Sequence, residues 1–278
     1  MANDKPLTQA IVRSLLRSPF QAEDSAHPWA LEISADPSQP LLRTWDSRSG
    51  SQPDAMGRMF SRSPRERLDT ATTREKFLAI HADHKRWDPT PFISFTQSPD
   101  ELQENAKRRA QKRGSQTITA LNPNVRAKNG LPILNMDKEM RFYGVPDPYG
   151  KSNEYYKNHY VCLWEVAKEE IVGHWEWADL LETDHWYEDI ILPTFKTHNR
   201  NYFGGGAFDM SALLDLLPEP QVSATEARPF HRGFGFSDFD TSSEGEEVRF
   251  VEDCFEEEYD SYDEVEEDNA ADDSLNGI

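Results

Sequence analysis

Three short stretches decide the fold class of this chain: residues 41–46 (LLRTWD), 92–96 (FISFT) and 160–164 (YVCLW). Each is rich in the aromatic and branched apolar residues that favour buried β-strands. Two further stretches, 116–121 and 131–136, share this character. Because helical patterns alternate with these strands, we expect a mixed α/β domain of the α+β kind.

The helical patterns have recognisable boundaries. A helix with apolar residues at helical spacing is expected after Thr8, ending before Pro19. Thr72 and Glu75 have the spacing of a capping box and predict a second helix that ends near residue 87. Further helices are expected at about 98–114, at 186–192 where Pro193 stops the pattern, and at 210–217.

The composition along the chain predicts four parts. Residues 1–20 form an N-terminal helical arm, and residues 21–39, rich in Pro, Ser, Asp and Ala, form a linker. Residues 40–218 hold the α/β core with its C-terminal helices. Residues 219–278 form a disordered acidic tail.

The charge of the chain is concentrated in that tail. Acidic residues outnumber basic residues by 50 to 30, and residues 238–273 contribute −17 of the net charge of −20. The tail interleaves acids with aromatic residues, a pattern typical of disordered interaction segments. A basic protein is therefore the expected partner of the tail. Nucleic acid is disfavoured as a partner, because the net negative charge repels phosphates.

Cysteine content and hydropathy indicate the compartment. The two cysteines, Cys162 and Cys254, give no disulfide framework, which is typical of a reducing environment. No stretch approaches the roughly 20 apolar residues of a membrane-spanning helix, and residues 1–20 lack the apolar core of a signal peptide. We expect a soluble cytoplasmic or nuclear protein without a membrane partner. The oligomeric state stays open.

The order and spacing of the three strands resemble the ADP-ribosyltransferase fold of the heat-labile-enterotoxin type, over roughly residues 40–182. The resemblance implies a split, largely antiparallel β-core and NAD as the cofactor. Arg43 matches the strand arginine that contacts the NAD phosphate and ribose. Ser94 and Thr96 match hydroxyls of the Ser-Thr-Ser-like triplet that supports the NAD cleft, whereas Phe95 departs from the usual threonine. The resemblance thus predicts that Arg43 and Ser94 face the same groove.

The third motif of that family, a Glu-x-Glu before a late strand, is altered. Lys157 and His159 occupy the two acidic positions, and His159 replaces the catalytic glutamate. An imidazole cannot supply the negative charge that stabilises an oxocarbenium-like transition state. Glu154 and Glu165 are the alternative acids if the register differs. The chain also resembles an uncharacterised fungal domain family of this fold class, whose Asn/Ser-Glu-Tyr pattern is matched by residues 153–155.

Two functions stay open at this stage. The first is an intracellular ADP-ribosyltransferase-like domain with a degenerate NAD site, which is either a weak NAD hydrolase or a site for binding alone. The second is a non-catalytic interaction protein whose acidic-aromatic tail binds basic partners.

Other patterns have simpler interpretations. His81 and His84 have no third ligand at suitable spacing, so we expect a solvated helix face rather than a metal site. Five bases within residues 107–113 complement a helix dipole at its C-terminus, and a nuclear-import signal or an acidic-partner patch is the functional alternative.

Overall fold

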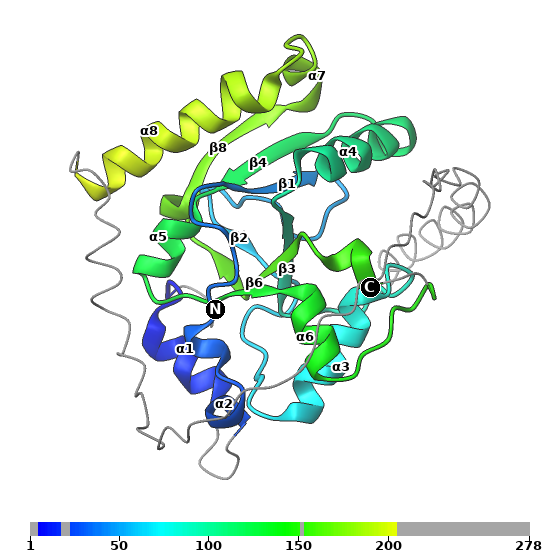
Figure 1. Cartoon of the computed structure of the whole chain (residues 1–278), viewed down its shortest axis with the longest axis vertical. Helices are drawn as coiled ribbons and strands as arrows, with labels where there is room; N and C mark the ends of the chain where they lie inside the picture. The colour runs from blue at the N-terminus through cyan, green and yellow to red at the C-terminus, as the bar shows by residue number, and fades with distance from the viewer. Residues whose placement is uncertain (1–4, 18–22, 151–152, 205–278) are drawn as a thin grey trace, which may run out of the picture. The chain divides into compact units, whose positions relative to one another are not determined.

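Figure 1 shows the computed structural model, which describes residues 5–17, 23–150 and 153–204. The chain divides into two units, Met1–Pro218 and Glu219–Ile278, and all described residues lie in the first unit. The helix expected at 210–217 and the acidic stretch 238–273 lie outside the described residues. Strands and helices alternate along the first unit, which confirms the mixed α/β class.

A six-stranded antiparallel sheet forms the centre of this unit, in the order β5-β6-β3-β1-β4-β8. A separate two-stranded antiparallel ribbon joins β2 and β7. The strands are β1 (Leu41–Trp45), β2 (Met59–Phe60), β3 (Phe92–Thr96), β4 (Thr117–Leu121), β5 (Ile133–Asn135), β6 (His159–Leu163), β7 (Glu165–Val166) and β8 (Ile171–Glu176). The five strands expected from the sequence are all present, and Ile171–Glu176 supplies the last strand.

The sheet is split between its two middle strands. β1 pairs with β4 over five residue pairs, and β3 pairs with β6 over five, but β1 and β3 share the single pair Leu42–Thr96. Beyond that pair the two strands no longer bond to each other. Figure 1 accordingly shows β8, β4 and β1 together in the upper half, with β3 turning away toward β6. The expected split, largely antiparallel core is therefore observed.

Helices surround the sheet. They are α1 (Gln9–Leu16), α2 (Glu23–Ala26), η1 (Trp29–Leu31), α3 (Ala71–Ala82), α4 (Pro99–Arg113), α5 (Pro123–Lys128), α6 (Met136–Phe142), η2 (Asn153–Tyr156), η3 (Lys168–Glu170), α7 (Trp177–Leu180), η4 (Tyr187–Ile191) and α8 (Leu192–Phe203). Within the described residues no helix has the length and apolar character needed to cross a membrane.

The two faces of the sheet have different coverings. Helices cover one face: α1, α3 and α6 pack on the β3–β6–β5 half, and α4 and α7 on the β1–β4 half. The opposite face carries a smaller apolar cluster that includes Ile93, Phe95 and Cys162, closed by Met59 and Val166 of the β2–β7 ribbon. We call this second side the ribbon face and the first the helix face.

Three helix boundaries differ from the sequence-based prediction. The end of α3 falls at Ala82 rather than near residue 87. The N-cap of α3 is Thr70 rather than Thr72, because the Thr70 hydroxyl accepts the Thr73 backbone N–H while the Thr73 hydroxyl bonds back to Thr70. Pro193 does not stop a helix but lies in the first turn of α8, where its missing N–H costs no intrahelical bond.

The N-terminal segment is part of the core: α1 is the helix expected within residues 1–20, and the stretch expected as a linker contains two further short helices. Val12 and Leu16 of α1 and Trp29 of η1 are fully buried in the cluster on the helix face. Residues 23–35 contain α2 and η1 rather than open connector. The Pro- and Ser-rich composition reflects short turns between docked elements.

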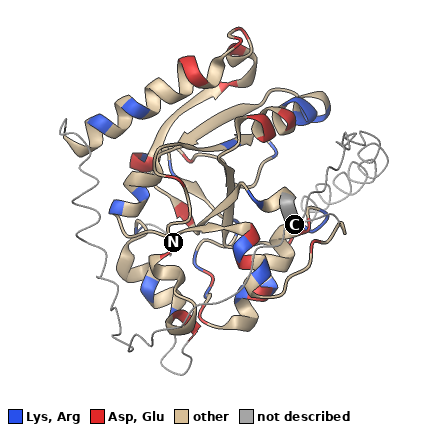
Figure 2. Cartoon of the chain, in the orientation of Figure 1, with Lys and Arg blue, Asp and Glu red and all other residues tan. Residues whose placement is uncertain are grey.

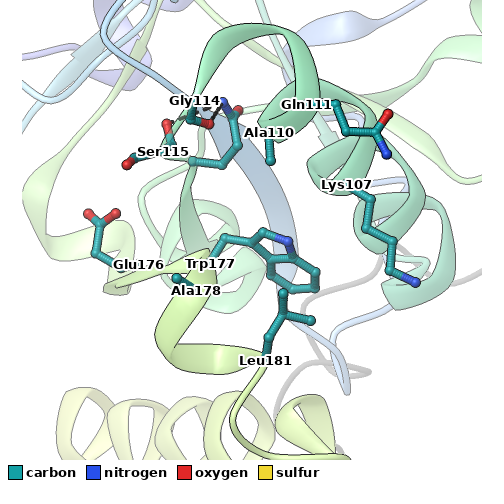
Figure 3. A pocket seen from close by; sticks show the side chains of 10 residues that line it. Lys107, Ala110, Gln111, Gly114, Ser115, Glu176, Trp177, Ala178 and Leu181 are labelled. Atoms are coloured by element: carbon teal, nitrogen blue, oxygen red, sulfur yellow. Dashed lines mark hydrogen bonds between the residues drawn. The ribbon is translucent and has the colours of Figure 1, made fainter.

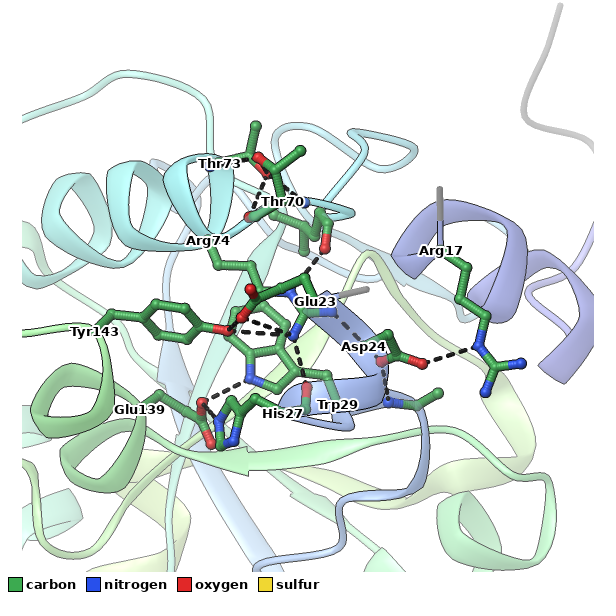
Figure 4. Close-up of polar contacts among 12 residues, drawn as sticks. Arg17, Glu23, Asp24, His27, Trp29, Thr70, Thr73, Arg74, Glu139 and Tyr143 are labelled. Carbon is green, nitrogen blue, oxygen red and sulfur yellow. Dashed lines mark hydrogen bonds and ion pairs between the residues drawn. The ribbon is translucent and has the colours of Figure 1, made fainter. Parts of the chain in front are cut away.

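A buried arginine fastens this segment to α3. Figure 4 shows Arg74 between Glu23, Asp24 and Tyr143, with its guanidinium over the Trp29 ring at 4.4 Å. Arg74 is fully buried and donates to the backbone carbonyls of Leu68 and His27. Because an unpaired buried charge is costly, removal of any carboxylate partner would destabilise this contact.

Shortening a buried side chain of α1 tests whether the N-terminal segment stabilises the folded unit. We predict that Leu16→Ala lowers the free energy of unfolding by about 2–5 kcal/mol, since Leu16 is fully buried and its truncation leaves a cavity. Chemical denaturation measures this loss. Arg13→Ala, on the exposed side of the same helix, should change the free energy by less than about 0.5 kcal/mol. Equal, small effects of both substitutions would mean that α1 is an undocked arm.

Candidate functional site

Arg43 lies in the split of the sheet. Its side chain reaches from β1 to β3, where Nη1 donates to the backbone carbonyl of Ser94 at 3.1 Å. That carbonyl lies beyond the point where β1 and β3 stop pairing, so the guanidinium replaces a lost strand partner. Arg43 Nε is buried and has no hydrogen-bond partner among the residues that the structure describes.

The positive charge of Arg43 is only partly offset by negative charge nearby. Burial, together with the positive charge of nearby Arg109, lowers the pKa of Arg43 to about 10, although Asp46 partly opposes the shift. Asp46 itself accepts from Arg109 and Gln116 rather than from Arg43. The split therefore contains a desolvated positive charge to which no carboxylate of the described residues is bonded.

The prediction that Arg43 and Ser94 face one groove is wrong. Leu42 pairs with Thr96, so Arg43 falls level with Phe95, and Thr44 with Ser94. Because paired residues share a face and successive residues alternate, Arg43 belongs to the ribbon face and Ser94 to the helix face. Only the Ser94 backbone carbonyl, not its hydroxyl, reaches the guanidinium.

The Ser94 hydroxyl is bound to a histidine of α3. Its Oγ lies 2.7 Å from His81 Nε2, and His81 Nδ1 lies 3.0 Å from Thr90 Oγ1. Burial, with the positive charge of neighbouring His84 and Arg43, lowers the pKa of His81 to about 3. The ring is thus neutral at pH 7 and uses one nitrogen as donor and the other as acceptor. A base with such a low pKa is a weak activator for a serine nucleophile.

The Glu101 carboxylate of α4 lies where β3 ends and β6 begins. Thr96 Oγ1 donates to Glu101 Oε2 at 2.9 Å, and Asn158 Nδ2 donates to Glu101 Oε1 at 2.9 Å. His159 Nε2 lies 3.7 Å from Glu101 Oε2. Glu101 stands in the first turn of α4, where the helix dipole favours an anion, and Figure 2 shows acids at this end and bases at the other.

His159 begins β6, opposite Thr96. Burial lowers the pKa of His159, although the Glu101 carboxylate partly opposes the shift. The residue at the position of the expected catalytic glutamate is therefore biased toward a neutral ring. Lys157, at the other altered position, is exposed, and its backbone carbonyl accepts from Asn135 Nδ2.

Of the two alternative acids, Glu165 does not supply a carboxylate at the split. Glu165 is fully buried on β7, where its Oε2 accepts from Arg65 and from the Leu7 backbone N–H. It therefore anchors the N-terminal segment, and the prediction of Glu165 as a catalytic substitute is wrong. The side chain of Glu154 lies outside the described residues.

Two residues of the site were missed from the sequence. Glu101 was assigned only to the start of a helix, yet its carboxylate bonds Thr96, five residues earlier, across the strand–helix turn. His81 was expected on a solvated helix face, but it is half-buried against Ser94. The sequence does offer one signal for Glu101. A helix that packs back on the preceding strand brings its first-turn acid close to the last residue of that strand, Thr96. The described residues contain no cluster of His, Cys, Asp and Glu able to hold a metal ion.

Fold and site together define a mixed α/β domain with a split antiparallel sheet and a poorly compensated arginine in the split. A family model described as a domain of unknown function, DUF7587, matches residues 36–180, just over half of the chain. The chain belongs to this family. The match contains the whole split site but not α1, α2 or η1, which the fold nevertheless requires. No curated protein matches the chain.

The depressed pKa of His81 predicts sensitivity to acid. An unfolded histidine titrates near pH 6.5, so as pH falls below 6.5 the unfolded chain binds a proton that folded His81 refuses until about pH 3. His81 should therefore remove up to about 1.4 kcal/mol of stability per pH unit over this window. Unfolding free energies at pH 7 and 5.5 should differ less in His81→Asn than in the wild type.

His185→Asn is the matched control, because His185 is exposed. It should keep the wild-type difference between the two pH values. An unchanged difference in His81→Asn would show that His81 is not held neutral by the fold.

Proposed function

We propose that this chain is a non-catalytic, ADP-ribosyltransferase-like domain that binds NAD through Arg43. The observation that carries the proposal is the guanidinium in the split. Within the described part of the chain its buried Nε has no partner, and no carboxylate bonds it. The planar fork of arginine suits phosphate oxygens and bonds them at two points. A bound diphosphate would supply the negative charge that the protein does not.

The proposal gives Ser94 and Thr96 roles different from those in the family they resemble. Both hydroxyls point to the helix face, where they bond His81 and Glu101. They are therefore positioning groups for α3 and α4, and Arg43 alone of the three is left to contact the nucleotide.

The proposal omits catalysis because the described residues place no free carboxylate at the split. Lys157 and His159 occupy the positions of the two glutamates, and Glu101 is held by a hydroxyl, an amide and an imidazole. Loss of one well-placed electrostatic group costs on the order of 10²–10³ in rate. Two such losses leave binding as the supported function.

A second function follows from the sequence of the tail. An interaction protein would use the described unit as a scaffold and the acids and aromatic residues of 238–273 to bind a basic partner. This alternative needs no nucleotide, so NAD binding separates the two.

The test is calorimetric titration with NAD. We predict saturable binding by the wild type and its loss in Arg43→Ala, because the cation that pairs with the diphosphate is removed. Arg43→Lys should bind at least about tenfold more weakly, since lysine is a point charge without the two-point fork. Arg86→Ala, at an exposed surface arginine, is the matched control and should bind as the wild type does.

Two results would contradict the proposal in different ways. No binding of NAD by the wild type at millimolar concentration would remove the nucleotide site and leave the interaction function. Labelling of an arginine acceptor by labelled NAD would show that an acid does work here, and that the domain is catalytic.

A further inference from the structure

Arg43 shares a row of the sheet with two further polar residues on the ribbon face. It pairs with Thr119 of β4, and Thr119 pairs with His174 of β8, so the three residues lie side by side across three strands. Neighbouring strands are about 4.8 Å apart, which places the backbone of His174 about 10 Å from that of Arg43. The ribbon face therefore presents a second polar position beside the split.

A chain of hydrogen bonds fixes the His174 ring. Trp45 Nε1 donates to Thr119 Oγ1 at 2.8 Å, and Thr119 Oγ1 lies 2.7 Å from His174 Nδ1. An indole nitrogen can only donate, so Thr119 accepts from Trp45 and has its own proton left for His174 Nδ1. Since Thr119 is fully buried, the opposite assignment would leave its hydroxyl proton without an acceptor among the described residues. Nδ1 is therefore the acceptor, and Nε2 carries the ring proton.

The Nε2–H group of His174 is left for a ligand. His174 is exposed, and in the described part of the chain no group bonds its Nε2. Partial burial lowers the pKa of His174, so the ring is neutral at pH 7 and the Nε2–H is an uncharged donor. The Trp45 ring meets the imidazole edge-on, with 6.2 Å between the ring centroids, and limits its rotation.

A carboxylate on the same strand disfavours a phosphate at His174. Glu176 lies two residues further along the same face of β8 and accepts from the Thr117 hydroxyl at 3.0 Å. Figure 3 shows this carboxylate beside the hollow between α4 and α7, turned away from Lys107. Within the described residues Glu176 forms no ion pair. An anion bound to His174 would meet this charge, whereas an uncharged acceptor would not.

We propose that His174 is a second contact of the nucleotide site and donates to an uncharged acceptor of the nucleoside, while Arg43 binds the diphosphate. This inference rests on the proposed function, because Arg43 supplies the anion contact. The separation of about 10 Å is longer than a diphosphate and suits the nucleoside joined to it. The site would thus prefer a diphosphate that carries a nucleoside over free pyrophosphate.

The experiment compares NAD with inorganic pyrophosphate by calorimetric titration of the full chain. His174→Asn keeps an acceptor for the Thr119 hydroxyl but has no atom at the position of Nε2. It should bind NAD about fivefold more weakly, since one neutral hydrogen bond is lost, and pyrophosphate as the wild type does. His174→Gln, which restores a donor near that position, should recover most of the NAD affinity. His185→Ala, at an exposed histidine, is the matched control and should leave both affinities unchanged.

The hydrogen-bond assignment is tested without a ligand by ¹⁵N NMR of the histidine rings near pH 7, with His174→Asn to assign the signal. Nε2 should carry the proton and Nδ1 should not. A proton on Nδ1, an unchanged NAD affinity in His174→Asn, or an equal loss of NAD and pyrophosphate in that variant would overturn this inference alone. A wild type that binds neither ligand, or an Arg43→Ala variant that binds both normally, would overturn the proposed function and this inference with it.

Discussion

The contact between Arg43 and the Ser94 carbonyl sets the geometry of the central sheet. β1 and β3 bond at one residue pair and then separate, which would leave the edge of β3 with an unpaired carbonyl. The guanidinium takes that place and so allows the sheet to open without a buried orphan acceptor. Around it, Arg109 bonds Asp46 and so joins α4 to the residue after β1.

The rest of the unit keeps this split in place from its helix face. His81 and Glu101 reach β3 from α3 and α4 and bond the two hydroxyls that alternate with the ribbon-face residues. α3 is in turn held by Arg74 and the N-terminal segment. The residues outside the family match are thus linked, through α3, to the strand that borders the split.

Strands were predictable from the sequence because apolar and branched residues occur in short runs there, and the order of these runs agrees with the structure. Helix α4 was predictable because Ser98, Pro99 and its acids form a local start signal, and Ser98 does accept the Glu101 N–H. The prediction that Pro193 ends a helix was wrong because η4 continues directly into α8, with Pro193 in its first turn. A proline tolerated in a first turn and a proline that ends a helix look the same in one sequence.

The chemistry of the site was less accessible. The sequence identified Arg43 as a candidate binding residue. The face of the sheet to which its side chain belongs, however, depends on the register of one residue pair, Leu42 with Thr96. A shift of a single residue would have put Arg43 and Ser94 on the same face. The burial of Glu165 was also not predictable from the sequence. Its contacts with Arg65 and Leu7 depend on how the N-terminal segment folds back onto the core.

The state of Arg43 is measured most directly by ¹H–¹⁵N NMR of the arginine side chains, with Arg43→Lys to assign its signal. A buried Nε–H without a partner should give a resonance that exchanges slowly with water and shifts on addition of inorganic pyrophosphate. Fast exchange, as for an exposed arginine, together with no response to pyrophosphate, would contradict a desolvated and poorly compensated cation in the split.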